Sequence, residues 1–424
     1  MKSKKLSSIL IWSVVSAAFI GPGTITTAVT AGSKYGLSLL WTIVFSSIAC
    51  LVLQEVAARI TIASGSNLGQ VLTQKFGSRK GSFLKFFIGG SVVLGCAAYE
   101  AGNILGAVSG LNLLSGVDTK FLTILLVLIA GSILWSGRQK LISKVMLFFV
   151  VLMGVAFMVL ALSQDFTVVE VVSNTWKPNI PSGAELITLG LVGTTIVPYN
   201  LFIGSGISKG QEINYMRIGL SVSVLLGGLT TAAILIAGTS VGDFSSFENL
   251  ATAFQNNLGR IGRVAMACGL FAAGFSSTIT APFATSVIGE TVFHIQGKKK
   301  LALLWGAVLL VGFVFGISGI KPIPVILFVQ ALNGFILPLL VYYLIIIVNS
   351  AEVIPDKFRH PHIYNGLLLL ILGSVLMMGL NNIAKAIISG FSIEFEHHLF
   401  VIITITLIIL VFAGNKIFSR SKTL

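Results

Sequence analysis

The sequence predicts an all-α integral membrane protein with about twelve transmembrane helices, of which the first and the sixth are interrupted. Composition is the first reason: 55% of the 424 residues are hydrophobic and only 10% are charged, whereas soluble domains carry roughly 25% charged residues. The second is that apolar segments recur along the whole chain. The third is that two of these segments contain a proline near their middle, beside small or hydroxyl-bearing residues.

Each apolar segment predicts one helix, because most reach the ~20 residues that cross a hydrocarbon core of ~30 Å. The segments lie at about 8–31, 38–62, 84–110, 121–137, 144–163, 184–207, 215–240, 263–290, 302–320, 323–348, 363–383 and 398–418. The longest loops, 164–183 and 241–262, read as surface connections with room for short helices. No loop is long enough for a soluble domain, so we expect residues 1–424 to form one transmembrane domain.

The net charge of +14 follows from membrane topology. With the N-terminus in the cytoplasm, most Lys and Arg residues fall in inner loops and most acidic residues in outer loops, which is the positive-inside pattern. We therefore expect a multi-pass protein of the inner membrane with both termini cytoplasmic, in contact with lipid and not with nucleic acid. The first segment is too long and too broken for a signal peptide, so it belongs to the mature protein.

The two interruptions read Gly21-Pro22-Gly23-Thr24 and Val197-Pro198-Tyr199-Asn200. A proline removes one amide donor and clashes with the preceding turn. Backbone groups freed in this way persist in a membrane only where protein or water surrounds them. Two facing breaks would thus form a polar pocket at mid-depth, lined by half-helix ends with partial charges of both signs. A simple proline kink is the alternative at either position.

The breaks also predict an internal repeat, since each opens a set of five helices. The first repeat spans about 8–163 and the second about 184–348, with additional helices at about 363–418. Five is an odd number, so the two sets would cross the membrane in opposite directions. Interrupted helices at matching positions of two such halves mark the central site of many transporters.

Five stretches resemble the NRAMP family of proton-coupled divalent metal transporters. The run AFIGPGTITTAVTAGSKYGLSLLW is similar to that family's first helix, and LVLQEVAARITIASGSNLGQ to its second. GTTIVPYNLF is similar to its sixth-helix break, while GLFAAGFSSTIT and VQALNGFILP match its eighth and tenth helices in pattern. The resemblance covers about ten segments and implies the five-plus-five inverted repeat of the leucine-transporter type.

The resemblance also implies a substrate site with altered chemistry. The positions that correspond to the family's metal ligands are Ala18, Gly21, Thr24, Thr194, Val197 and Tyr199. The family's breaks read Asp-Pro-Gly-Asn and Met-Pro-His-Asn, so Gly21 replaces the aspartate and Val197 replaces the methionine. Ala18 and Thr194 would offer backbone carbonyls, and only the Thr24 hydroxyl remains as a side-chain metal donor. Without the carboxylate and the thioether, transport of Mn²⁺ or Fe²⁺ is in doubt.

Further polar residues in or near the spans are candidates for coupling or gating. Glu100 corresponds to an acid of the family's proton route, and Asn103, one helical turn later, replaces a second acid. The functional readings of Glu100 are a proton-coupling group or a displaced substrate ligand, and the alternative is a structural acid that hydrogen-bonds across helices. Glu55 and Arg59 form an expected i,i+4 ion pair that is either structural or part of a gate.

Three more residues are expected near the pocket. Gln330 either lines the pocket or bonds a neighbouring helix. Phe275 stands where the family has a glutamine. Tyr199 could stack on an organic group, donate its hydroxyl, or pack against the neighbouring half-helix.

The function that the resemblance implies is secondary transport of a metal cation, with protons as a candidate coupling ion. The alternative keeps the scaffold but moves a small organic solute or a non-transition cation. A non-transporting sensor or assembly factor is a third reading, which the lack of a sizeable soluble region disfavours. No span or loop shows a nucleophile–base pair, a nucleotide loop or a metal-ligand cluster, and the cysteines Cys50, Cys96 and Cys268 match no redox spacing. We therefore expect neither an enzyme nor a cofactor.

Overall fold

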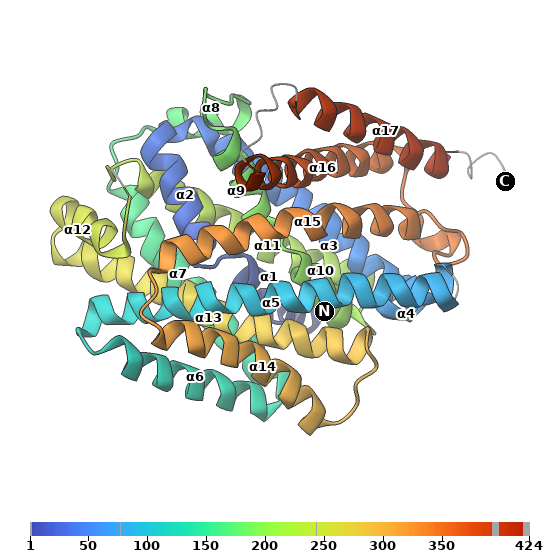
Figure 1. The fold of residues 1–424 in the computed structure, drawn as a ribbon, viewed down its shortest axis with the longest axis horizontal. Coiled ribbons are helices and arrows are strands. Elements are labelled where there is room, and N and C mark those ends of the chain that lie inside the picture. The colour runs from blue at the N-terminus through green and yellow to red at the C-terminus, as the bar shows by residue number, and fades with distance from the viewer. Residues whose placement is uncertain (1, 77, 243, 392–397, 419–424) are drawn as a thin grey trace.

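The computed structural model describes residues 2–76, 78–242, 244–391 and 398–418, and in these ranges the regular structure is helical (Figure 1). The helices of the first half are α1 (Lys2–Phe19), α2 (Pro22–Tyr35), α3 (Leu40–Ser64), α4 (Leu68–Phe76), α5 (Ser78–Ser115), α6 (Thr119–Ser136), α7 (Gln139–Leu162) and α8 (Val168–Trp176). Those of the second half are α9 (Glu185–Thr195), α10 (Pro198–Ser208), α11 (Ile213–Gly238), α12 (Phe247–Leu258), α13 (Arg260–Thr291), α14 (Lys298–Ile317), α15 (Pro322–Val348), α16 (His362–Phe391) and α17 (His398–Phe418). Short 3₁₀ turns, η1 (Gly36–Leu39) and η2 (Asp356–Phe358), complete the set.

Each of the twelve predicted segments coincides with a helix or with an interrupted pair of helices. Among the described residues, ten helical stretches are long and apolar enough to cross a membrane, and two shorter apolar stretches lie in α1 and α15. The two long loops carry the short helices α8 and α12. The prediction of an all-α integral membrane protein is confirmed.

Both predicted interruptions are present, and proline explains where each second half begins. Pro22 and Pro198 occupy the first turn of α2 and α10, where a missing amide costs nothing. The residues before them, Gly21 and Val197, have extended backbones with φ of −111° and −93°. Both helices are therefore fully broken into two halves rather than kinked.

The bundle has a buried centre and two outer edges. The core helix is α13, in which 83% of the most apolar stretch is buried, against 22% in α14 and 17% in α17. Small residues allow close packing around α13: a Cβ added to Gly274 would lie 2.3 Å from the backbone nitrogen of Ala107 on α5. In Figure 1, α6 and α14 lie along one edge and α16 and α17 along the opposite one.

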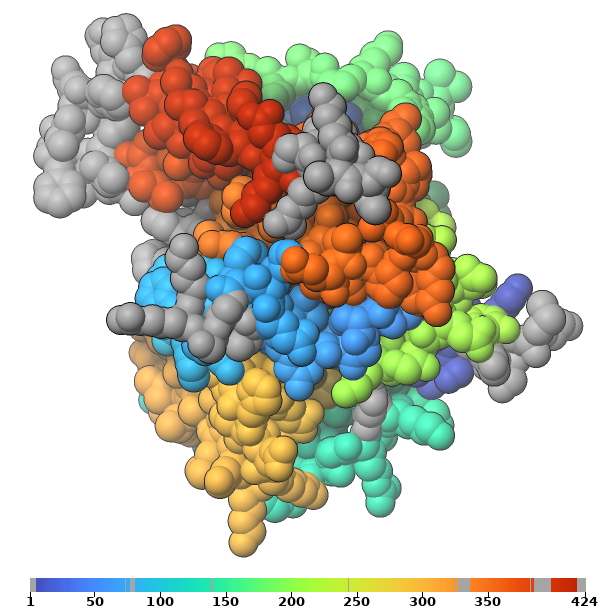
Figure 2. Space-filling view, turned by 90° about the vertical axis from the view of Figure 1, so that its right-hand side faces the viewer, coloured from blue at the N-terminus to red at the C-terminus, as the bar shows by residue number. Residues whose placement is uncertain are grey.

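One end of the bundle, seen in Figure 2, holds α4 beside the connection between α15 and α16. Lys75 of α4 forms an ion pair with Glu352 of this connection. Glu352 is otherwise on the surface, whereas the Lys75 side chain is buried. The positive-inside pattern of the sequence predicts that this end of the bundle faces the cytoplasm.

Candidate substrate site at the paired helix breaks

The two helix breaks lie against each other and are joined by hydrogen bonds. The Tyr199 hydroxyl donates to the carbonyl oxygen of Ala18 at 2.7 Å. The Asn200 amide nitrogen donates to the carbonyl oxygen of Val15 at 3.2 Å. The Ala18 carbonyl lies in the last turn of the half-helix α1 and has no helical partner of its own, so the Tyr199 side chain, which follows Pro198, satisfies a carbonyl that precedes Pro22.

A small cavity lies between the breaks, with a volume of about 20 Å³ for the centre of a water-sized sphere. Its lining residues are Ala18, Phe19, Gly21, Gly23, Thr24, Tyr99, Asn103, Thr194, Val197, Tyr199 and Ser277. A cavity needs about 10–15 Å³ by this measure to hold one water molecule. The site therefore has room for one water or one ion, and it is closed to any organic solute in this conformation.

The cavity brings together six residues that the sequence proposed as substrate ligands, together with Asn103. The seventh, Gln330, lies in α15, and its side chain is outside the described residues. None of the lining side chains carries a formal charge. The Thr24 hydroxyl donates to the carbonyl oxygen of Phe19 at 2.6 Å, and the Thr194 hydroxyl to that of Leu191 at 3.1 Å. Both hydroxyl oxygens keep lone pairs for a ligand.

Two unpartnered hydroxyls at the cavity were missed by the sequence analysis. Tyr99 and Ser277 both line it, and within the described chain neither hydroxyl has a hydrogen-bond partner. Such buried groups cost free energy unless a water or an ion satisfies them. The ring of Tyr99 meets that of Tyr199 edge to face at 5.8 Å between centroids. The spacing of four residues between Tyr99 and Asn103, which places both on one helical face, was the available signal.

The residue of α13 that faces the cavity is not the one that the sequence analysis considered. Phe275 does not line the cavity; its ring packs against Phe149 at 5.3 Å and Phe271 at 5.6 Å. Ser277, two residues later, faces the break, because a Cβ added to Gly21 would lie 3.1 Å from its Oγ. The α13 contribution to the cavity is thus a hydroxyl rather than an aromatic ring.

Glu100 lies behind the cavity wall and is fully buried. Asn103, which does line the cavity, donates to Glu100 Oε2 at 3.3 Å, and Glu100 Oε1 has no partner among the described residues. Its side chain also abuts α14, since a Cβ added to Gly312 would lie 2.8 Å from Glu100 Cγ. This acid is therefore reached from the cavity through the Asn103 amide and does not line the cavity itself.

Glu55 and Arg59 form the expected ion pair, and it belongs to a larger cluster. Arg59 Nε donates to Glu55 Oε2 at 3.1 Å, and Arg217 of α11 donates two hydrogen bonds to Glu55 Oε1 at 2.9 and 3.0 Å. The Tyr364 hydroxyl of α16 donates to Oε2 at 3.2 Å, and Arg59 also donates to the carbonyl oxygen of Phe358 at 2.6 Å. We call these five residues the Glu55 cluster; it joins α3, α11, η2 and the start of α16.

The described residues offer few ligands for a permanently bound metal ion. Within the described ranges, no three residues of the types His, Cys, Asp and Glu lie close enough to hold a metal. The three cysteines are free, and Cys50 and Cys96 are buried. Any cation at the breaks would be held by hydroxyl, amide and carbonyl oxygens.

Comparison with known proteins agrees with this geometry. The family model described as "Natural resistance-associated macrophage protein-like" matches residues 13–385. The divalent metal cation transporter MntH of Erwinia tasmaniensis is 22% identical over 356 residues, 78% of this chain and 84% of that protein. That of Pectobacterium carotovorum is 23% identical over 343 residues, 76% of this chain and 81% of that protein.

Solved structures with the same fold include transporters. A mutant of the Eremococcus coleocola manganese transporter superposes with a TM-score of 0.78 at 21% identity, covering 98% of this chain and 94% of that one. MhsT in complex with L-phenylalanine gives a TM-score of 0.61 at 17% identity, covering 89% and 98%. These likenesses confirm the leucine-transporter-type architecture with two interrupted helices. Since the family model spans most of the sequence, the chain belongs to the natural resistance-associated macrophage protein (NRAMP)-like family of integral membrane transport proteins.

Proposed function

We propose that the chain is a secondary active transporter of the inner membrane, with cytoplasmic termini, that carries a hard, oxygen-preferring metal cation through the paired breaks. The single observation that carries this proposal is the cavity, which has the size of one ion and polar groups that are all oxygen or amide. Hard cations such as Mg²⁺ and Ca²⁺ take oxygen ligands, while sulfur ligands favour softer ions. The family's metal-transporting relatives support a cation, and the replacement of the thioether by Val197 disfavours selection of Mn²⁺ or Fe²⁺.

In this proposal Glu100 is the coupling group. A carboxyl in the interior of a bundle is a default candidate for proton or ion coupling, and Asn103 links it to the cavity. The carboxyl would release its proton when the cation enters and thereby supply the charge that the cavity wall lacks. The hydrogen bond between Glu100 and Asn103 would connect this loss of a proton to the cavity.

The competing function is transport of a small organic solute held by the tyrosines. The facing rings of Tyr99 and Tyr199 are the observation in its favour. An organic solute would require the two breaks to separate, because the closed cavity holds only a water-sized particle. A cation requires no such expansion.

The decisive experiment is uptake into proteoliposomes with Mg²⁺, Ca²⁺ and Mn²⁺, beside calorimetric titration of the same ions. We expect saturable uptake of Mg²⁺ or Ca²⁺ with weaker Mn²⁺ binding, and loss of uptake in Thr24→Ala. Thr26→Ala is the matched control, because Thr26 is a buried threonine of the same helix that donates to the Pro22 carbonyl and does not line the cavity. Uptake of none of the three ions would overturn the cation proposal.

Coupling is tested with the variant Glu100→Gln, which keeps the shape of the side chain. Cation uptake by the native chain should be accompanied by a pH change in the lumen, and the variant should abolish that change. A native-like proton flux in Glu100→Gln would remove Glu100 from the mechanism.

A further inference from the structure

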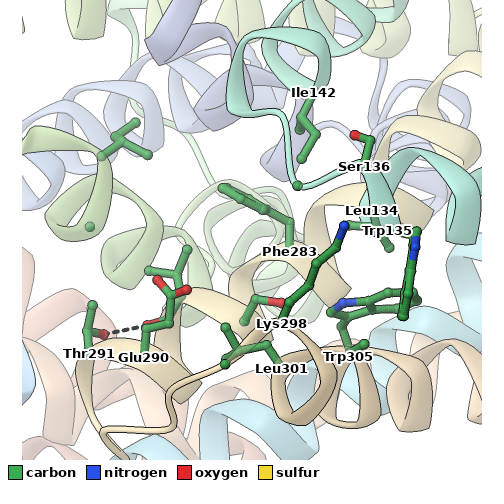
Figure 3. Close-up of a pocket in the computed structure, with 17 residues that line it drawn as sticks. Leu134, Trp135, Ser136, Ile142, Phe283, Glu290, Thr291, Lys298, Leu301 and Trp305 are labelled. Carbon is green, nitrogen blue, oxygen red and sulfur yellow. Dashed lines mark hydrogen bonds between the residues drawn. The ribbon is translucent and has the colours of Figure 1, made fainter.

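A second, much larger cavity opens at the end of the bundle that the positive-inside pattern assigns to the cytoplasm. Its volume is about 560 Å³, and its walls come from the ends of α6, α10 and α13 and from the starts of α7 and α14 (Figure 3). It shares no lining residue with the cavity between the breaks. None of the roles considered so far uses it.

The walls of this cavity carry one positive and one negative side chain on opposite sides. Figure 3 shows Lys298 beside Trp135 and Trp305 on one side, and Glu290 on the other. The Lys298 amine lies 5.1 Å from the centre of the Trp135 ring, a cation–π arrangement. Both charged side chains are exposed, and in the part of the chain that the structure describes neither forms an ion pair. The cavity thus offers separate partners for an anionic and a cationic group.

The same cavity lies at the lipid-facing edge of the bundle. Its outer walls belong to α6 and α14, in which only 28% and 22% of the most apolar stretch is buried. Leu303 of α14 and Leu128 of α6 expose most of their side chains, 75% and 64%. Tryptophan at the end of such helices is typical of the interface between headgroups and acyl chains. The ligand would therefore be an amphiphile that reaches the cavity from the bilayer.

We propose that this cavity binds the headgroup of one membrane phospholipid that carries both a phosphate and a primary ammonium, as phosphatidylethanolamine does. The phosphate lies at Lys298 and the ammonium at Glu290. The acyl chains leave between α6 and α14 along the apolar surface around Leu301 and Trp305. Basic pockets between transmembrane helices bind phospholipid headgroups in this manner, and the carboxylate of Glu290 adds a preference for a zwitterionic one.

Bound lipid at this position would touch the transport machinery. Gly206 and Ile207 of α10, the second half of the sixth helix, form part of the wall. A Cβ added to Gly206 would lie 2.5 Å from Val287 of α13, which lines the same cavity. The bound lipid would fill the space beside this close contact between α10 and α13.

The test uses the full-length protein purified in detergent and mixed with phosphatidylethanolamine or phosphatidylglycerol of equal chain length. Native mass spectrometry should show one phosphatidylethanolamine retained in preference to phosphatidylglycerol. Lys298→Gln should weaken retention of both lipids, and Glu290→Gln should abolish the preference by weakening only the phosphatidylethanolamine. Each loss should be about two- to fivefold, the range of a partly exposed charge pair.

Matched controls separate this site from the general attraction of a basic surface for lipid. Lys299→Gln and Lys300→Gln remove the same charge from exposed neighbours that do not line the cavity, and they should leave retention unchanged. Equal retention of both lipids by the native chain, or equal losses in Lys298→Gln and Lys299→Gln, would overturn the proposal.

A measurement on the native chain makes the test independent of any variant. Phosphatidylethanolamine with brominated chains should quench the fluorescence of Trp135 and Trp305, and soluble phosphoethanolamine without chains should fail to compete with it. Competition by the soluble compound at the same concentration would overturn the membrane source of the ligand.

Discussion

The Glu55 cluster and the cavity at the two helix breaks contain different kinds of polar group. The cavity collects hydroxyls, amides and carbonyls with no formal charge in its wall, whereas the Glu55 cluster concentrates one carboxylate and two guanidinium groups in a small volume. Buried charge is strongly attracted to a partner and costly without one. The comparison teaches that the charges of the Glu55 cluster join distant helices to one another, whereas the cavity wall presents only dipoles to whatever enters it.

The largest expected effect comes from removing the centre of the Glu55 cluster. Glu55→Gln leaves Arg59, which is 5% exposed, as an uncompensated buried cation. We expect a loss of about 3–5 kcal/mol in stability, measured by thermal unfolding in detergent. The control is Glu248→Gln, whose pair with Arg263 is partly exposed and should cost less than about 1 kcal/mol. Equal losses in the two variants would contradict the structural role of the cluster.

The next effect comes from the packing that supports the first break. Gly106→Ala would place a Cβ 2.3 Å from Cγ of Pro22, so α5 or the break must shift at a cost of about 1–3 kcal/mol. Cation uptake should fall with the stability. Gly90→Ala on the same helix meets nothing within 4 Å and should be neutral or stabilising. If both variants behave alike, the break does not depend on α5.

Adding a charge to the cavity would sharpen the comparison. In Gly21→Asp the new Cβ lies between Ser277 Oγ at 3.1 Å and Asn103 Oδ1 at 3.7 Å, so the carboxylate enters the site. We expect Mn²⁺ to bind roughly tenfold tighter or more, a gain of about 1.4 kcal/mol, measured by calorimetry. Gly21→Asn has the same shape without the charge and should show no comparable gain. Tighter binding in both variants would mean that shape, not charge, limits the native site.

The smallest expected effect is on the pH dependence of stability, and it comes from His360 at the edge of the Glu55 cluster. Burial, and then Arg59, lower the pKa of His360 from its ordinary 6.5, while its hydrogen bond with Asn365 acts in the opposite direction. The unfolded chain therefore binds a proton more readily than the folded one, and stability is lost as the pH falls below 6.5 toward the folded pKa. Melting temperatures over this range should fall less in His360→Asn than in the native chain, and identical pH profiles would exclude His360.

Local patterns were sufficient to predict the spans and the breaks, because hydropathy and proline act over one or two helical turns. Ala18, Gly21 and Thr24 line the cavity at the first break for this reason, while their role in substrate binding stays a prediction. The sequence could not supply the rotation of long buried helices, which is why Phe275 was considered and Ser277 was missed. Nor could it pair Glu55 with Arg217 or Tyr364, since those contacts join distant segments through tertiary packing. The division into repeats at 8–163 and 184–348 and the cytoplasmic termini remain predictions.

The size of the cavity between the breaks also bears on rate. A space of about 20 Å³ cannot admit an ion with its inner shell of water, so the ion must arrive almost bare and exchange its waters for protein oxygens one by one. Mg²⁺ gives up water reluctantly, whereas Ca²⁺ accepts irregular, flexible coordination. Turnover of different ions should then follow the speed of their water exchange rather than the strength of their binding, and an ion that binds well could still be carried slowly.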